Sequence, residues 1–419
     1  MEKAFIVGVN IDDGSDFELS MKELESLCEA CDMEVVGRST QALDKATTAT
    51  YIGSGKVLEV KEAAHTLEAD IVIFDNALSP MQLRNLQDEL DMPVMDRTTL
   101  ILEIFSSRAK TKEAKLQVEV ARLQYMLPRL VGLHDALSRQ GGGSGALSNK
   151  GAGEKKLELD RRRLEQRLTS MKKELEGISE ERKVQRQRRS LSNTPRVALV
   201  GYTNAGKSTI MNRMLDLYGA EEEKKVFEKN MLFATLDTTV RRIDLPDRNP
   251  FLLSDTVGFI SKLPHNLVKA FRSTLEEVRE ADLLVQVVDY SDEHHKNYIE
   301  VTMETLKELE AQNIPMILVY NKSDKAGMDD VVIQGDDKIF MSAKNPEHLE
   351  KLVDLIEGKL AGGYEKCTFL FPYHRGDIVS YLNEQAVVHA TDYKENGVEV
   401  VATVKKCDAG KFREFITEM

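Results

Sequence analysis

The hydrophobic and polar positions of residues 1–106 alternate between two periods. Apolar runs such as "AFIVGVNI" and "DIVIFDNA" have the length and composition of buried strands, and amphipathic stretches separate them. Strands spaced by helices favour a small parallel sheet. Ser79 and Pro80 match the capping residue and the first residue of one such helix. We therefore predict an N-terminal parallel α/β domain.

Residues 107–192 carry a different repeat. Apolar residues recur at alternating spacings of four and three through 116–130 and again through 157–178. This heptad spacing predicts helices with one apolar seam that faces a partner helix. Between them, residues 141–154 ("GGGSGALSNKGAGE") are so rich in glycine that we expect a mobile loop. The region thus predicts a long antiparallel helical hairpin, whose first helix we expect Pro128 to kink.

Strand and helix patterns alternate again over residues 193–363, and a shorter region follows over 364–419. Apolar strands such as "RVALVG", "PFLLSDTVG" and "PMILVYNKSD" each end in a polar loop. They predict a second, mostly parallel sheet with helices on both faces. In the last region, Asn396 and Gly397 predict a hairpin turn before "VEVVATVKK". We expect this region to be a small α+β domain.

Composition and charge restrict the class of protein. A chain of 419 residues is longer than one hydrophobic core requires. The start "MEKAFIVGVN" has no secretory pattern, and no apolar run approaches the ~20 residues of a spanning helix, so we expect a cytoplasmic protein. The net charge of −13 argues against indiscriminate coating of nucleic acid, although basic runs at 160–163 and 182–189 allow local contacts with phosphates. Cys28 and Cys31 are expected to be core residues rather than a zinc or redox site.

The stretch after "RVALV" matches G-x-x-x-x-G-K-S/T between a strand and a helix, which is typical of a phosphate-binding loop. Glycines let backbone N–H groups converge on phosphate oxygens, and the helix N-terminus adds partial positive charge. We expect Lys207 to contact the β- and γ-phosphates and Ser208 to bind Mg²⁺. Asn204 could either offer its carbonyl oxygen to a monovalent cation such as K⁺ or make a loop hydrogen bond. The expected nucleotide contacts here are Gly201, Tyr202, Thr203, Asn204, Ala205, Gly206, Lys207, Ser208 and Thr209.

Three further motifs follow, each at the carboxyl end of a predicted strand. In "DTVG", Asp255 can hold Mg²⁺ through water and the Gly258 N–H can meet the γ-phosphate. In "NKSD", the carboxylate of Asp324 can accept from the N1–H and exocyclic amine of guanine, a pair of donors that adenine lacks. In "SAK", a backbone N–H can meet the guanine carbonyl. The motifs comprise Asp255, Thr256, Val257, Gly258, Asn321, Lys322, Asp324, Ser342, Ala343 and Lys344. Their order predicts a GTPase.

The stretch "MLFATLDTTVRRIDLP", at 231–246, lies where a GTPase needs a threonine that binds Mg²⁺ and senses the γ-phosphate. Thr235, Thr238 and Thr239 all qualify from the sequence. The residue after the "DTVG" motif is Phe259, whereas many GTPases use glutamine there to orient the attacking water. Because phenylalanine cannot do this, we expect slow intrinsic hydrolysis that a partner accelerates.

A second glycine-rich stretch, "YIGSGK" at 51–56, has only one residue between its glycines and no buried strand before it. It therefore lacks the length of a phosphate-binding loop. We expect a tight turn whose glycines and Lys56 meet another backbone, of protein or RNA.

Together, "YIGSGK", "GYTNAGKST", "LFATLDTT", "DTVGFISKLPH", "NKSD" and "LFPYHRGDIVSYL" resemble the HflX family of translation-associated GTPases over nearly the whole chain. The resemblance implies a GTPase that binds the large ribosomal subunit in its GTP form and acts in splitting, rescue or assembly of ribosomes. It implies that the helical arm carries its loop toward the peptidyl-transferase region. At the loop tip, 149–154 departs from the Arg-Gly-Pro-Gly-Glu-Thr run of relatives.

The resemblance also implies site residues and partners. It implies Thr235 as the Mg²⁺ ligand of the first switch, so that Lys207, Thr235 and Gly258 are the expected catalytic groups. The expected nucleotide contacts of this switch are Phe233, Ala234, Thr235, Leu236 and Asp237. We expect GTP or GDP, Mg²⁺ and rRNA as ligands, and a monomer without a membrane span. The alternative is a GTP-dependent RNA-modifying or other RNA-binding enzyme, although residues 1–190 contain no visible catalytic constellation for modification.

Overall fold

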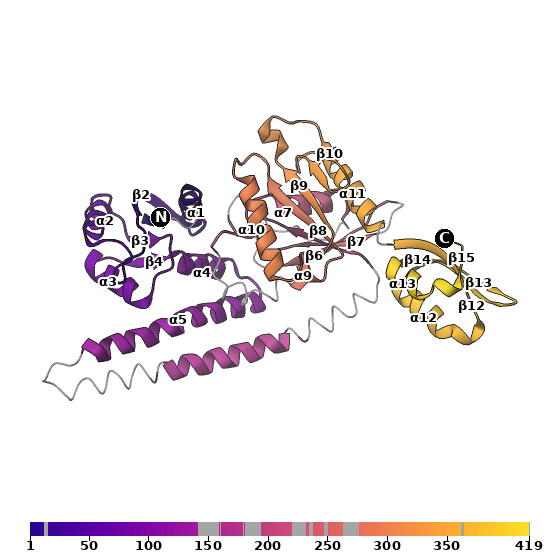
Figure 1. Ribbon diagram of the computed structural model, residues 1–419, viewed down its shortest axis with the longest axis horizontal. Helices are drawn as coiled ribbons and strands as arrows, with labels where there is room; N and C mark the ends of the chain where they lie inside the picture. Colours follow the sequence, from indigo (N-terminus) through magenta and orange to yellow (C-terminus); the bar gives the residue numbers. More distant parts are fainter. Residues whose placement is uncertain are drawn as a thin grey trace. The chain divides into compact units, whose positions relative to one another are not determined.

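The computed structural model (Figure 1) describes residues 1–11, 16–140, 159, 161–178, 180, 194–219, 232–233, 238–246, 250–262, 276–361 and 364–418. Contacts divide the chain into two compact units. The first contains Met1–Ile178 together with Lys229–Asp237 and Ile260–Ser273. The second contains Ser179–Glu228, Thr238–Phe259 and Thr274–Met419.

The first unit is built on a parallel sheet with the strand order β2-β1-β3-β4 (Figure 1). The four residues of β3 are all buried, as expected for a parallel strand that is covered on both faces. This confirms the predicted parallel α/β region. Its elements are β1 (Glu2–Asn10), α1 (Phe17–Ala30), β2 (Met33–Ala42), α2 (Ser54–Thr66), β3 (Ile71–Phe74), α3 (Pro80–Leu90), β4 (Val94–Asp96) and α4 (Arg97–Arg108).

Two helix starts in this unit show how the sequence acts locally. Ser79 caps α3 in a reciprocal pair of hydrogen bonds with Gln82, and Pro80 opens the helix as predicted. The stretch "YIGSGK" differs from the expected tight turn, because α2 already begins at Ser54. Gly53 is the capping residue there, and its N–H donates to the Gln41 side chain at 3.1 Å.

The helical hairpin belongs to the same unit. Its first helix, α5 (Lys112–Gln140), continues through Pro128, and residues 161–178 form the second helix. Ion pairs join Lys112 to Glu174 at 2.5 Å and Glu119 to Arg167 at 3.0 Å. Residue numbers increase along the first helix as they decrease along the second, so the two helices are antiparallel, as predicted. The glycine-rich connection at 141–154 lies outside the described residues.

The second unit contains a seven-stranded sheet with the order β10-β11-β9-β8-β5-β7-β6. Five strands are parallel, and the edge strands β6 and β10 are antiparallel to their neighbours. Helices α7 and α11 pack on one face, and α9 and α10 pack on the other. The elements are β5 (Arg196–Val200), α7 (Lys207–Tyr218), β6 (Thr239–Ile243), β7 (Phe251–Asp255), α9 (Glu276–Arg279), β8 (Leu283–Asp289), α10 (His295–Glu308), β9 (Met316–Asn321), β10 (Val332–Gln334), β11 (Lys338–Phe340) and α11 (Pro346–Ala361).

An antiparallel sheet with the order β13-β14-β12-β15 ends the chain. The predicted hairpin is present, with Lys394 paired to Gly397. Gly397 has a φ of 152°, and a Cβ there would lie 2.3 Å from the carbonyl oxygen of Phe371, so glycine is required. The elements are β12 (Tyr364–Phe371), α12 (Gly376–Gln385), β13 (Val387–Lys394), β14 (Gly397–Lys405), α13 (Lys406–Lys411) and β15 (Ile416–Glu418). Among all described helices, none is both long and apolar enough to cross a membrane.

Candidate nucleotide-binding site

The phosphate-binding loop leaves β5 and turns sharply into α7. Gly206 has a φ of 101°, and a Cβ there would lie 2.2 Å from the side-chain nitrogen of Asn321. Both the backbone conformation and the close approach therefore require glycine. The loop closes so tightly that its start lies beside the first residue of the helix. Lys207 Nζ donates to the carbonyl oxygens of Gly201 at 2.9 Å and Tyr202 at 2.7 Å.

The ammonium group of Lys207 is buried, and burial lowers its pKa to about 8. Neutral carbonyl oxygens hold this group, and they offset the loss of hydration less well than an anion would. A phosphate placed between the loop amides and Lys207 would supply that anion. The electrostatics of the loop thus fit a polyphosphate ligand.

The candidate Mg²⁺ residues meet at the carboxyl ends of two neighbouring strands. Pairing of β5 with β7 places Asp255 opposite Leu199, just before the phosphate-binding loop. The Ser208 hydroxyl donates to Asp255 Oδ2 at 2.6 Å. A hydroxyl beside a carboxylate is an all-oxygen donor set of the kind that Mg²⁺ prefers. The structure therefore brings together two of the expected ligands, Ser208 and Asp255.

Of the first switch stretch at 231–246, the structure describes residues 232–233 and 238–246, with the candidate Thr239 as the first residue of β6. Phe233 is buried, and its ring packs edge-on against Phe105 of α4, with ring centroids 4.6 Å apart. The expected metal ligand Thr235 lies outside the described residues, as do its neighbours Ala234, Leu236 and Asp237.

The residues after β7 lie directly on the phosphate-binding loop. The Phe259 N–H donates to the Gly201 carbonyl at 3.1 Å, and the Thr203 N–H donates to the Phe259 carbonyl at 2.9 Å. A Cβ on Gly258 would lie 2.8 Å from Thr203 Cα, so this close approach also needs glycine. Thr256 is held against β5, because its hydroxyl donates to the Leu199 carbonyl at 2.6 Å.

The ring of Phe259 is buried in the core beneath α10, where it packs in one cluster with Val200, Leu284 and Leu306. Only 4% of the residue is exposed. A buried phenyl ring carries no group that could orient water. This location fits the expectation that Phe259 does not take the place of the usual glutamine.

Two side chains of the "NKSD" motif tie three loops together. Asn321 donates to the Ala205 carbonyl at 2.9 Å and accepts from the Ala343 N–H at 3.0 Å. Lys322 donates to the Asn204 carbonyl at 2.8 Å and pairs with Asp289 at 2.7 Å. The phosphate loop and the two expected guanine loops are therefore positioned by direct hydrogen bonds.

Asp324 carries the clearest mark of a ligand site. Its Oδ1 is buried and has no hydrogen-bond partner among the described residues, while Lys344 lies 3.6 Å from Oδ2. Burial opposes ionisation, but the Ser342 hydroxyl and Lys344 outweigh it and hold the pKa of Asp324 below its usual value. A buried acceptor without a donor costs about 1–3 kcal/mol. The two donors on the edge of guanine would satisfy this carboxylate.

In the "SAK" loop, two of the three backbone amides already have partners within the protein. The Ala343 N–H is bound by Asn321, and the Ser342 N–H donates to His348 Nδ1 at 3.0 Å. The Lys344 N–H makes only a long contact of 3.4 Å with the Ser342 hydroxyl. Lys344 therefore has the amide that is most available to a ligand.

His348 is a residue of this site that its sequence pattern does not reveal. It lies in the first turn of α11 and is only 4% exposed. Because its Nδ1 accepts a hydrogen bond, the ring is neutral and carries its proton on Nε2. No spacing pattern could have revealed this role, since the partner is a backbone amide. Tyr298 was also not predicted. Its ring stacks on that of Tyr202, with ring centroids 4.2 Å apart, and this contact joins residues that are far apart in the sequence.

The two neighbouring cysteines of the first unit do not form a reactive or metal-binding pair. Cys28 is buried, and burial raises the pKa of its thiol to about 12 and that of Cys31 to about 11, so both are protonated at neutral pH. Among the described residues, no group of three or more His, Cys, Asp or Glu side chains is arranged to hold a metal ion.

The sheet is mostly parallel, and a glycine-bounded loop opens a helix whose serine is bonded to a strand-end aspartate. Together with the Asp324 carboxylate, whose Oδ1 has no partner among the described residues, this arrangement defines a P-loop GTPase. Three families match successive parts of the chain. They are "GTP-binding GTPase N-terminal" over residues 18–106, "GTP-binding GTPase Middle Region" over 108–189 and "50S ribosome-binding GTPase" over 196–322.

Curated relatives with the name GTPase HflX match almost the whole chain. The relative from Caldanaerobacter subterraneus subsp. tengcongensis is 43% identical and covers 99% of this chain and 94% of its own. The relatives from Alkalihalophilus pseudofirmus and Escherichia coli are 42% and 38% identical, and each covers 94% of this chain and 92% of its own. This chain belongs to the HflX family of GTPases, which confirms the resemblance. It is a GTP hydrolase of a ribosome-associated family.

A solved structure gives a weaker likeness. The GTP-binding protein from Sulfolobus solfataricus in complex with GDP is 24% identical, with a TM-score of 0.44, and the match covers 86% of this chain and 99% of that one.

Proposed function

We propose that this GTPase binds the large ribosomal subunit in its GTP form and acts in splitting, rescue or assembly of ribosomes. The family description "50S ribosome-binding GTPase" over residues 196–322 supports the choice of partner. The helical arm offers a suitable surface, because its second helix turns apolar residues inward and exposes Arg162 and Arg163. Exposed arginines suit the phosphates and the wide minor groove of rRNA.

We infer that guanine is read by Asp324, and this is the observation that carries the nucleotide assignment. Its buried Oδ1 would accept from the N1–H or the exocyclic amine, and the Lys344 N–H would donate to the guanine carbonyl. Asn321 and Lys322 act indirectly, since they hold the guanine loops against the phosphate loop. An adenine would leave the Asp324 carboxylate without its donors.

For hydrolysis we propose Lys207, Thr235 and Gly258 as the groups that meet the γ-phosphate. Lys207 would exchange its two carbonyl partners for β- and γ-phosphate oxygens. Ser208, Thr235 and, through water, Asp255 would hold Mg²⁺. When bound, the ion neutralises charge that develops on the phosphates. The carbonyl oxygen of Asn204 could also bind K⁺. In the structure this backbone oxygen accepts a hydrogen bond from Lys322.

Because the Phe259 ring is buried in the core, another group has to orient the attacking water. We propose that intrinsic hydrolysis is slow and that the ribosome accelerates it, so that the nucleotide acts as a switch. We further propose a monomer with four domains, over residues 1–106, 107–192, 193–363 and 364–419. Each would have its own sheet or helix pair.

Two measurements test the proposal. Asp324→Asn should weaken GDP binding and strengthen binding of xanthosine diphosphate, because the amide donates where the carboxylate accepts. Full-length protein should co-sediment with isolated large subunits when a non-hydrolysable GTP analogue is present. It should co-sediment much less when GDP is present. Equal sedimentation in both nucleotides would rule out the switch. Binding to free structured RNA but not to subunits would favour the RNA-modifying alternative.

A further inference from the structure

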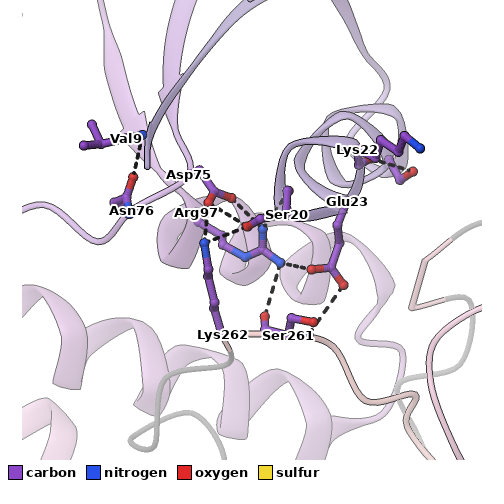
Figure 2. A network of polar contacts seen from close by, with 10 residues as sticks. Val9, Ser20, Lys22, Glu23, Asp75, Asn76, Arg97, Ser261 and Lys262 are labelled. Atoms are coloured by element: carbon purple, nitrogen blue, oxygen red, sulfur yellow. Dashed lines mark hydrogen bonds and ion pairs between the residues drawn. The ribbon is translucent and has the colours of Figure 1, made fainter. Parts of the chain in front are cut away.

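A buried group of charged side chains lies in the first unit (Figure 2). Asp75 follows β3, Arg97 opens α4 and Glu23 lies on α1, and they are only 1%, 2% and 8% exposed. Arg97 pairs with Asp75 at 2.7 Å and with Glu23. These three side chains carry two negative charges and one positive charge.

A second positive charge comes from a segment that is distant in sequence. Lys262 donates to Asp75 Oδ2 and to the Ser20 hydroxyl, each at 2.7 Å (Figure 2). The guanidinium of Arg97 donates to the carbonyl of Ser261 at 3.2 Å. Arg97 and Lys262 outweigh the cost of burial and hold the pKa of Asp75 below its usual value. The backbone of Ser261 and the ammonium of Lys262 are thus both held by this unit.

Lys262 has an unusual backbone conformation. Its φ of 56° lies in the left-handed region, which residues with a side chain seldom adopt. Removing one partner from a buried ion-pair network leaves an uncompensated charge and is strongly unfavourable. The network therefore retains the segment even though its backbone is strained.

This segment follows directly after the residues that lie on the phosphate loop. Ile260, which is 3% exposed, is the single residue between Phe259 and Ser261. Phe259 exchanges backbone hydrogen bonds with Gly201 and Thr203. A shift of Gly258 toward a γ-phosphate therefore has to move a backbone that is fixed a few residues later by Lys262.

We propose that Lys262 and Asp75 set the discrimination between GTP and GDP. Their ion pair holds residues 260–262, keeps the Phe259 carbonyl on the Thr203 N–H and opposes the contact between the Gly258 N–H and a γ-phosphate. GDP lacks the γ-phosphate, so the Lys262–Asp75 ion pair does not oppose GDP binding. By linkage, GTP and the ion pair weaken each other to the same degree. This inference rests on the proposed role of Gly258.

The test compares affinities of full-length variants for GDP and for a non-hydrolysable GTP analogue. Lys262→Met should strengthen binding of the analogue by about 5- to 20-fold, a typical size for coupling between sites, and leave GDP affinity within about twofold. Lys262→Arg retains the charge and should keep the parental ratio. Lys3→Met, which removes the surface ion pair of Lys3 with Glu68, is a matched control that should also leave the ratio unchanged.

A second variant guards against loss of folding. Lys262→Met removes the cation that pairs with Asp75, whereas the double variant Asp75→Asn with Lys262→Met also removes the negative charge and leaves the net charge unchanged. The double variant should fold and show the same shift in ratio. An unchanged or reversed ratio in the double variant would overturn the inference. If Asp324→Asn still alters base preference in that case, the proposed nucleotide site stands and only the restraint by Lys262 fails.

Discussion

The imidazole Nδ1 of His348 accepts the backbone N–H of Ser342 at 3.0 Å, deep beneath the loop that we assign to guanine. This bond and the one from Ala343 to Asn321 leave Lys344 with the available amide. A side chain that touches no nucleotide atom thus decides which amide of the loop can reach the base. His348 is in this sense a positioning residue.

We expect His348→Leu to weaken GDP binding by about tenfold, because the loop loses the hydrogen bond that positions the Lys344 amide. The buried N–H left without an acceptor should also lower the stability of the fold by about 1–3 kcal/mol. His348→Asn places a carbonyl oxygen near the position of Nδ1 and should restore most of the affinity. Isothermal titration calorimetry measures both variants. Equal losses in the two variants would indicate a packing role instead of a hydrogen-bonding one.

The buried Lys207 predicts proton uptake when nucleotide binds. Its pKa of about 8 lies below the ordinary 10.5, so the folded, unliganded chain binds fewer protons than the unfolded chain between these values. Stability of the unliganded protein therefore rises with pH over this window. Phosphates favour the charged amine, so GDP binding should take up about 0.9 proton at pH 9 and about a quarter of a proton at pH 7.5.

Calorimetry in buffers with different ionisation enthalpies measures this uptake. Uptake that does not change with pH would show that Lys207 is already charged before nucleotide binds.

The two glycine-rich stretches should respond differently to the same substitution. Gly206→Ala would place a Cβ 2.2 Å from the Asn321 side chain, and we expect it to abolish nucleotide binding. Gly55 lies in α2, and a Cβ there would meet nothing within 4 Å. Gly55→Ala should therefore leave GDP affinity unchanged and stabilise the protein by ~0.5–1 kcal/mol. Loss of GDP affinity in Gly55→Ala would point to a second nucleotide site at "YIGSGK".

The arm predicts a salt-dependent contact with RNA. Replacing Arg162 and Arg163 by Glu should weaken co-sedimentation with large subunits and reduce the dependence on salt by about two phosphate contacts. GDP affinity without subunits should not change. A matched control replaces Arg38 and Arg84 by Glu, two exposed arginines whose partners are surface carboxylates. If both double variants weakened co-sedimentation equally, the loss would be explained by the change in net charge alone.

Much of the fold and of the candidate site was readable from the chain. The parallel sheets, the antiparallel arm and the hairpin at Asn396 follow from periodicity and turn chemistry, which act over short distances. The motifs around Lys207, Asp255 and Asp324 could be grouped by sequence alone, because parallel strands put their carboxyl ends at one edge. The three-residue strands β10 and β15 were missed, since they are too short for a pattern to stand out.

By itself, the sequence determined which residue types could grip phosphate and read guanine, because that chemistry requires particular groups at particular spacings. Only the tertiary structure decided that Lys262 would complete a buried charge group around Asp75, 187 residues away. It alone buried the Phe259 ring in the core and placed His348 under the guanine loop. Such contacts depend on which surfaces the folded chain brings together, and charge neutrality and close packing leave no periodic trace along the sequence.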